Sequence, residues 1–176
     1  MLIFCDGEDH SEEFNIWLAN RGGMQAADAC SELTWSTDPP NPELNSLCGG
    51  TSNVDVIFIA TDDCGNSISS TADFRIVDVG NPTWEFIPED ITISCDEEAL
   101  FGTPIAIDSC STTTLEFWDE EFEGDFCDNP SYIIRSWVAR DECQWETTTI
   151  ATQKITFVDD APPVLTPVHD LSLIHI

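Results

Sequence analysis

Apolar and polar residues alternate along two stretches of the chain, and this period of two is typical of β-strands. The first stretch places four apolar residues on one side of a predicted strand: Val54, Val56, Phe58 and Ala60. The second stretch, residues 132–140, places Ile133, Trp137 and Ala139 in the same way. Clusters of Pro, Gly, Asn and Asp between such stretches indicate turns. Residues 12–20 have the one helix-like pattern, for which we predict one or two turns.

The sequence also matches itself at a shift of about 80 residues, which indicates an internal repeat. Residues 57–64 match residues 136–143 at a shift of 79, and residues 74–78 match residues 155–159 at a shift of 81. The first copy carries about ten additional residues around residues 14–18. Four cysteines recur in the same order in each copy: Cys5, Cys30, Cys48 and Cys64, then Cys95, Cys110, Cys127 and Cys143.

These matches predict two repeats, an N-terminally truncated one over residues 1–79 and a second over residues 80–160. Residues 161–170 are expected to begin a third, truncated repeat. Short strands and turns within units of about 80 residues predict an all-β fold of tandem immunoglobulin-like β-sandwiches stapled by disulfides. We interpret residues 171–176 as a translated sequencing adapter, and the alternative is a strand of the third repeat.

The charge of the chain is strongly negative, with 34 Asp and Glu against 5 Lys and Arg and a formal net charge of −29. Such a surface repels phosphate, which excludes nucleic acid and anionic membrane surfaces as partners. No stretch approaches the 18 apolar residues of a membrane-spanning helix, so membrane insertion is not expected. A cation such as Ca²⁺ is what this surface would attract.

The 8 cysteines are an even number and include no C-x-x-C motif, which favours disulfides in an oxidising, extracellular compartment over zinc or redox sites. Three connectivities are open in each repeat. The predicted strand topology favours pairs at the two ends of each sandwich. These pairs are Cys5–Cys48 with Cys30–Cys64, and Cys95–Cys127 with Cys110–Cys143.

Four segments carry a resemblance to a known family: residues 22–30, 33–35, 60–66 and 74–78. They are similar to the hyalin-repeat, immunoglobulin-like modules of giant surface proteins of gliding bacteria. The resemblance implies long tandem arrays exported by type IX secretion to the cell surface, where they act in adhesion or as stalks. The second copy departs from the pattern, because Gln144 and Trp145 replace the Gly-Asn that follows the last cysteine of the first copy.

Candidate catalytic groups are sparse, and we predict no catalytic residues and no enzyme activity. His10 lies next to Ser11 and Asp9, but neighbours in sequence form a solvated loop far more often than a catalytic triad. The acidic run over residues 118–125 contains carboxylates of the kind that glycosidases use. A charge run of this kind is more often a solvated face.

Calcium is the better-supported ligand, since oxygen donors from several loops suit Ca²⁺. No cofactor is required by this reading. The alternative is that the acidic residues only keep an extracellular surface soluble. The candidate ligands flank predicted turns and repeat junctions: Asp28, Asp62, Asp63, Asn66, Asp78, Asp108, Asp141, Glu142, Asp159 and Asp160.

The sequence therefore predicts a non-catalytic, rigid stalk or adhesion module whose partners are neighbouring repeats and an unidentified surface, glycan or protein. The alternative is an accessory or carbohydrate-binding module of a secreted hydrolase. Exposed tryptophans would favour that alternative, but Trp35 and Trp137 fall on predicted core strands. Trp145 falls in a turn and is the tryptophan whose exposure matters most.

Overall fold

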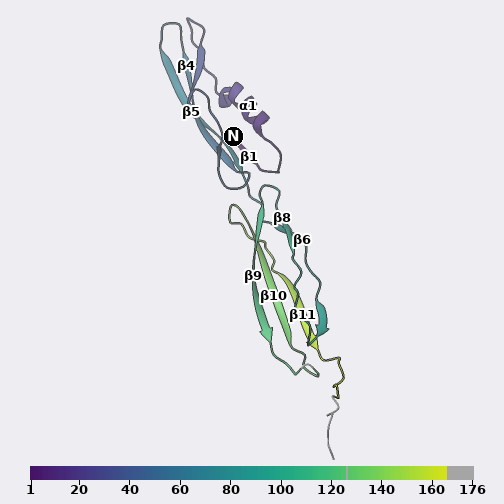
Figure 1. The fold of residues 1–176 in the computed structure, drawn as a ribbon. Coiled ribbons are helices and arrows are strands. Elements are labelled where there is room, and N and C mark those ends of the chain that lie inside the picture. Colours follow the sequence, from purple (N-terminus) through teal and green to yellow (C-terminus); the bar gives the residue numbers. More distant parts are fainter. Residues whose placement is uncertain (126, 166–176) are drawn as a thin grey trace, which may run out of the picture. The chain divides into compact units, whose positions relative to one another are not determined.

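The computed structural model describes residues 1–125 and 127–165, and β-strands dominate its regular structure (Figure 1). Residues 171–176 and the second half of the predicted third repeat lie outside the described residues. The helical elements are α1 (Ser11–Ala19) and the short 3-10 helix η1 (Arg21–Gly23). The strands are β1 (Leu2–Phe4), β2 (Thr34–Asp38), β3 (Asn45–Ser46), β4 (Ser52–Thr61), β5 (Ser67–Val77), β6 (Thr83–Phe86), β7 (Ile91–Ser94), β8 (Ile105–Ile107), β9 (Thr113–Phe122), β10 (Tyr132–Asp141) and β11 (Ala151–Val158).

The first sheet has the strand order β1-β5-β4-β2, with β3 also paired to β4. Strands β4 and β5 form a long antiparallel hairpin, while β1 runs parallel to β5. The alternation predicted for β4 is confirmed, because every second side chain is buried on one face of the sheet. Their exposed fractions are 5% for Val54, 0% for Val56, 2% for Phe58 and 2% for Ala60.

Helix α1 covers the buried face of this first sheet. Phe14 and Trp17 are both buried, and the Trp17 ring lies 5.6 Å from the Phe58 ring and 5.4 Å from the Phe74 ring. The helix was predicted, and the predominance of β-strands in several sheets, with two disulfides, confirms the predicted all-β class. The residues that are additional in the first copy supply a helical layer that buries the apolar face of the first sheet.

The second large sheet has the order β7-β11-β10-β9, and β6 and β8 form a separate antiparallel pair. Strand β7 runs parallel to β11, as β1 runs parallel to β5. The internal repeat matches β7 to β1, β9 to β2, β10 to β4 and β11 to β5. The two large sheets therefore have equivalent strand orders. Trp137 and Ala139 are buried on β10, as the alternation predicted, whereas Ile133 is only half-buried. Ile155 is buried on the neighbouring strand β11.

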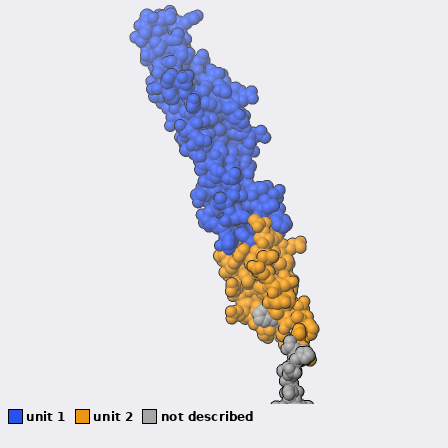
Figure 2. Space-filling model, in the orientation of Figure 1, with its two compact units in different colours: residues 1–87, 104–117, 137–151 blue, residues 88–103, 118–136, 152–176 orange. Residues whose placement is uncertain are grey.

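The chain divides into two compact units (Figure 2). Unit 1 comprises residues 1–87, 104–117 and 137–151, and contains the first sheet, helix α1 and the β6–β8 pair. Unit 2 comprises residues 88–103, residues 118–136 and the chain from residue 152 onward. The boundaries between these units fall inside strands β9 and β10, and not at residues 79 and 160 where the repeats are predicted to end. The predicted repeat boundaries stay a prediction.

The disulfides differ from the predicted pairs. The structure joins Cys5 to Cys110 and Cys48 to Cys143, with Cα–Cα distances of 5.8 and 5.0 Å. Both bonds link a cysteine of the first predicted repeat to a cysteine of the second. All four cysteines lie in unit 1. They converge on one turn, because a Cβ placed on Gly50 would lie 2.7 Å from the Cys5 Sγ and 3.0 Å from the Cys110 carbonyl oxygen. This convergence brings partners from both repeats within reach, which a pattern inside one repeat cannot reveal.

The predicted pairs Cys30–Cys64 and Cys95–Cys127 are not formed, and these four cysteines are free, exposed thiols in the structure. The turns that carry Cys30 and Cys64 are neighbours nonetheless, since the Asp63 amide donates a hydrogen bond of 3.5 Å to the Ser31 Oγ. The turns that carry Cys30 and Cys64 therefore lie close together, as the predicted pair requires, but the disulfide between them is not formed.

Candidate functional site

An aspartate two residues before a cysteine organises several of the cysteine-bearing turns. The Asp28 Oδ1 accepts the backbone N–H groups of Cys30 and Ser31, at 2.8 and 2.9 Å. In the second copy, the Asp108 Oδ1 accepts those of Cys110 and Ser111, at 2.8 and 3.0 Å. Such a turn is closed by the Asp side chain itself, so it fixes the carboxylate close to the cysteine in both copies.

The turns that follow β4 and β10 share one backbone conformation. The Asp62 amide donates to the Asn66 carbonyl oxygen at 2.9 Å, and the Asp141 amide donates to the Trp145 carbonyl oxygen at 3.0 Å. The fourth residue of each turn has a positive φ, 87° at Gly65 and 70° at Gln144. The two aspartates therefore hold equivalent positions, and their surroundings can be compared directly.

The two turns differ in how they satisfy the second carboxylate oxygen. In the first copy, the Asn66 Nδ2 donates to the Asp62 Oδ2 at 2.8 Å. Trp145 stands at the position of Asn66 and cannot reproduce this bond with its side chain, although its backbone N–H donates to the Asp141 Oδ1 at 2.8 Å. The Asp141 Oδ2 is consequently buried without a hydrogen-bond donor, on a residue that is only 2% exposed.

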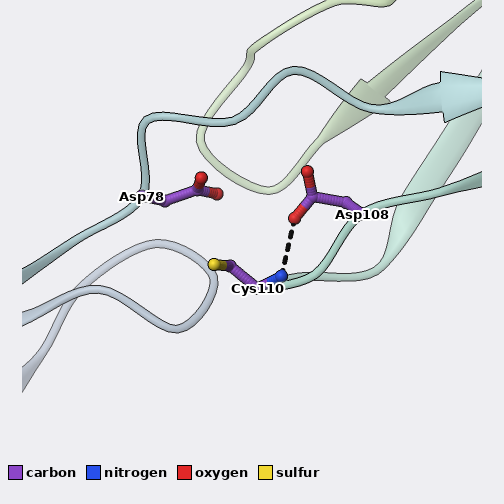
Figure 3. A group of neighbouring side chains, drawn as sticks. All are labelled: Asp78, Asp108 and Cys110. Carbon is purple, nitrogen blue, oxygen red and sulfur yellow. Dashed lines mark hydrogen bonds between the residues drawn. The ribbon is translucent and has the colours of Figure 1, made fainter. Parts of the chain in front are cut away.

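Asp78, just after β5, brings a second buried carboxylate to this place. Its Oδ1 accepts the Gly80 N–H at 2.8 Å, its Oδ2 has no donor, and the residue is 8% exposed. The carboxylate of Asp108 faces it (Figure 3), with ligand atoms of Asp78, Asp108 and Cys110 all within 4.8 Å of one another. Burial, and then the charges of Asp108 and Asp141, raise the pKa of Asp78.

We call Asp78, Asp108 and Asp141 the carboxylate cluster. All three lie in unit 1. While Asp78 and Asp141 are both ionised, neither Oδ2 has a donor, because carboxylates only accept hydrogen bonds. A proton on Asp78, whose pKa is raised in part by hydrogen bonding to Asp141, would join the two side chains. Asp78 was predicted from its place at a repeat junction, whereas Asp108 and Asp141 were predicted from equivalent loops. The structure brings Asp78 close to Asp108, and Asp141 is near enough to Asp78 to raise its pKa.

No basic side chain is found to neutralise the carboxylate cluster among the described residues. The chain has only 5 Lys and Arg, and each has another partner. Arg21 lies over the Trp35 ring, Arg75 pairs with Asp73, Arg135 with Asp119, Arg140 with Glu116 and Glu146, and Lys154 lies over the Tyr132 ring. The cluster therefore concentrates negative charge where burial makes that charge costly.

Sulfur is not available as a ligand at the cluster, because the Cys110 Sγ is bonded to Cys5. The predicted ligand Glu142 also points elsewhere. Its Oε2 accepts the Gly49 N–H at 3.1 Å and its Oε1 accepts the Thr112 hydroxyl at 2.7 Å. Glu142 thus connects the turn after β3 to the second copy. The ligand atoms that the carboxylate cluster can offer a cation are therefore all oxygens.

The remaining predicted ligands do not join the cluster. Asp28 and Asp62 lie near each other, but backbone N–H groups hold the pKa of Asp28 below its usual value, and the Asn66 side chain and backbone do the same for Asp62. Asp159 accepts the Ala161 N–H at 3.2 Å, and Asp160 accepts the Ser94 hydroxyl at 2.9 Å. Their oxygens are engaged in local hydrogen bonds.

The catalytic candidates remain separate. The His10 Nε2 lies 3.2 Å from the Asp6 Oδ1, at an angle that makes no hydrogen bond, and Ser11 donates to Asp9 at 2.9 Å rather than contacting His10. In the acidic run, Asp119 forms two hydrogen bonds of 2.7 Å with Arg135. That guanidinium lowers the pKa of Asp119 and holds it as a structural ion.

The tryptophans divide between core and surface. Trp137 is buried at 4% exposure, and Trp35 is half-buried beside the core beneath Arg21. Trp118 and Trp145 are exposed by 41% and 46%. Sequence reasoning identified the replacement of Asn66 by Trp145 but missed its consequence for Asp141, which becomes visible only once the two turns are compared.

Comparisons with known proteins yield only a weak likeness among those described here. No family model matches the chain, and no curated protein matches it. The crystal structure of Drosophila N-cadherin EC1-4 is similar at a TM-score of 0.31 and 15% sequence identity, over 74% of this chain and 42% of that chain. The chain thus spans less than half of that chain's length, and a TM-score this low does not define a shared fold. No described helix is long and apolar enough to cross a membrane.

Proposed function

We propose that this chain is a non-catalytic structural segment of a secreted bacterial cell-surface protein, acting as a rigid stalk or adhesion module. The observation that carries the proposal is the pair of disulfides between the first and second predicted repeats. A bond inside one repeat stabilises that repeat, whereas a bond between repeats also limits how far they can separate. The family resemblance, the acidic surface and the number of cysteines support the extracellular location.

The connectivity gives this restraint a definite length. The Cys5–Cys110 bond has a sequence separation of 105 residues and the Cys48–Cys143 bond one of 95. In a chain that is unfolded by pulling on its ends, the route from Cys5 to Cys143 crosses the first bond and follows only residues 110–143. A non-covalent contact adds to the restraint, since Glu142 of the second predicted repeat accepts the backbone N–H of Gly49 in the first.

Single-molecule pulling, with marker domains fused to both ends, tests the proposal. A reducing agent should lengthen the fully unfolded wild-type chain by the 105 residues of the Cys5–Cys110 loop, or roughly 360 Å at 3.3–3.6 Å per residue. No gain in length on reduction would contradict the cross-linked stalk. A match to another length would show a different connectivity.

Two variants make the measurement specific. Removing Cys5 and Cys110 by substitution with Ser leaves the Cys48–Cys143 bond, so reduction should then release 95 residues, or roughly 330 Å. Removing Cys48 and Cys143 should leave the wild-type gain unchanged, because the shorter route through Cys110 still limits extension. Equal gains in all three proteins would contradict the observed pairing.

A carbohydrate-binding module is the second candidate, and the exposed Trp118 and Trp145 favour it. Exposed aromatic rings stack on sugar rings through the same apolar contact that buries aromatic side chains in cores. Retention on insoluble polysaccharides, compared between the wild type and the Trp118→Ala and Trp145→Ala variants, distinguishes the two functions. Retention that both substitutions abolish would favour the binding module over the stalk.

A further inference from the structure

We propose that Asp78, Asp108 and Asp141 bind one Ca²⁺ ion. Acidic clusters are common without a metal, so the number of carboxylates alone indicates no ion. Two buried oxygens do indicate one, the Oδ2 atoms of Asp78 and Asp141, because neither has a hydrogen-bond donor in the part of the chain that the structure describes. Whether this site binds Ca²⁺ is independent of the function proposed above for the chain.

The first copy of the repeat shows what satisfies the equivalent oxygen when no ion is needed. There, the side chain of Asn66 donates a hydrogen bond of 2.8 Å to the Asp62 Oδ2, and Asp62 is only half-buried. In the second copy, Trp145 removes this donor while Asp141 becomes buried. The loss of a donor together with increased burial is costly unless another positive group approaches the oxygen.

The charges around the cluster lead to the same conclusion. Each of the five Lys and Arg side chains is engaged elsewhere, so none of them supplies a counter-charge to the cluster. Figure 3 shows the Asp78 and Asp108 carboxylates facing each other, and the backbone N–H of Cys110 donates a hydrogen bond to Asp108. A divalent cation would replace repulsion among three carboxylates by attraction to each of them.

The donor chemistry selects the ion. Zinc prefers nitrogen and sulfur ligands, and the Cys110 sulfur is already in a disulfide. Ca²⁺ takes six to eight oxygen ligands in flexible geometry, whereas Mg²⁺ requires near-ideal octahedral geometry. Asp78 also lines a groove of about 360 Å³ together with Arg75, Thr51 and Trp145, so this part of the cluster borders an opening to solvent.

Calcium binding is measured directly by isothermal titration of the oxidised, chelator-treated chain with CaCl₂, and with MgCl₂ in parallel. We expect one Ca²⁺ per chain, with a dissociation constant of about 10⁻⁴–10⁻³ M as in other extracellular modules, and Mg²⁺ at least tenfold weaker. Terbium provides a second readout, because Trp145 is bonded through its backbone to Asp141 and can sensitise Tb³⁺ luminescence.

Four variants locate the site. Asp78→Asn and Asp141→Asn should each weaken Ca²⁺ binding at least tenfold, while removing repulsion that opposes folding of the metal-free chain. Trp145→Asn restores the donor found at Asn66, and should weaken binding while leaving all three carboxylates in place. Asp62→Asn is the matched control, since it alters the equivalent turn of the first copy and should leave the affinity unchanged.

The outcomes are separable. Absence of heat and of sensitised Tb³⁺ luminescence up to 10 mM ion would overturn the proposal, as would equal affinities for wild type and Asp141→Asn. An Asp62→Asn variant that loses binding would place the ion in the first copy instead. Circular dichroism of each variant establishes that it is folded, and the Trp145→Asn result stands even where an aspartate variant fails to fold.

Discussion

At the scale of single residues, the turn after β10 holds Gln144 in a left-handed backbone conformation, with φ of 70°. This region is unfavourable for residues with a Cβ and easily adopted by glycine. The equivalent turn after β4 has Gly65 at that position, with φ of 87° and no atom within 4 Å of where a Cβ would lie. The same turn therefore exists in the chain with and without this conformational cost.

Two reciprocal substitutions test that cost. Gln144→Gly should raise the free energy of unfolding by about 0.5–1 kcal/mol, because the gain in φ freedom exceeds the greater entropy of glycine in the unfolded chain. Gly65→Ala should lower the free energy of unfolding by about 1 kcal/mol. Urea denaturation measures both, and effects of the same sign would contradict this account.

A second residue-scale prediction concerns Asp119 and Arg135, which share two hydrogen bonds of 2.7 Å. Arg135 lowers the pKa of Asp119 in the folded chain, so the pair stabilises the fold fully above the unfolded pKa of about 3.9. This contribution disappears as the pH falls through the lowered pKa. Asp119→Asn should therefore cost about 1 kcal/mol or less at pH 7, and nothing once the wild-type carboxyl is protonated.

Urea denaturation of both proteins at several pH values between 7 and 2 checks this. The two unfolding free energies should converge at the acid end. A difference that persists unchanged in acid would show that the substitution acts through packing and not through the ion pair.

At the scale of elements, helix α1 provides the layer that buries the first sheet. Phe14, Trp17 and the sheet residues Phe58 and Phe74 form one aromatic cluster, with ring centroids 5.3 to 6.0 Å apart. Without this helix, the apolar face of β4 and β5 would be exposed. The helix is thus part of the core of unit 1 rather than a surface decoration.

Trp17→Ala should accordingly destabilise the chain by about 3–5 kcal/mol, through lost apolar contacts and the cavity left behind. Ile16→Ala is the matched control, because Ile16 lies on the same helix but is 54% exposed, and it should change stability by less than about 0.5 kcal/mol. Chemical denaturation measures both. Equal effects would show that the helix does not pack on the sheet.

The elements were predictable to the extent that a local pattern encodes them. Alternation identified β4 and β10 and their buried faces, and residues 12–20 were expected to form the helix that the structure places at Ser11–Ala19. What α1 packs against could not be predicted, because no local signal distinguishes a helix that packs on the core from one that lies outside it. The cysteine pairing failed for a similar reason, since partners 105 and 95 residues apart depend on tertiary contacts.

The carboxylate cluster shows the same limit. Its three members were among ten predicted ligands, but separating Asp108 and Asp141 from Asp28 and Asp62 required knowing which carboxylates are buried. The one usable signal in the sequence was the change from Asn66 to Trp145 between copies. Its meaning depends on a hydrogen bond that only coordinates reveal.

At the scale of the whole molecule, the cysteines give the most direct test of the structure. We expect four free thiols in the oxidised chain, at Cys30, Cys64, Cys95 and Cys127. Thiol titration in denaturant counts them, because all eight cysteines are then accessible and only disulfide-bonded ones fail to react. A count of zero would show that all four join further disulfides.

Peptide mapping identifies the pairs themselves. Trypsin cleaves after Lys and Arg, so under non-reducing conditions residues 1–21 should remain linked to residues 76–135. Residues 22–75 should remain linked to residues 141–154, each through one observed bond. Linkage of residues 1–21 to residues 22–75 would instead support the pairing within a repeat that the sequence suggested.

The two disulfides also determine how the chain responds to a protease. Their loops overlap, since Cys48 lies between Cys5 and Cys110, and Cys110 lies between Cys48 and Cys143. A single cut at any peptide bond between Cys5 and Cys143 therefore leaves both fragments covalently joined. The chain can be nicked in an exposed turn and still transmit force from one end to the other, and only a second cut at a suitable place can release a piece of it.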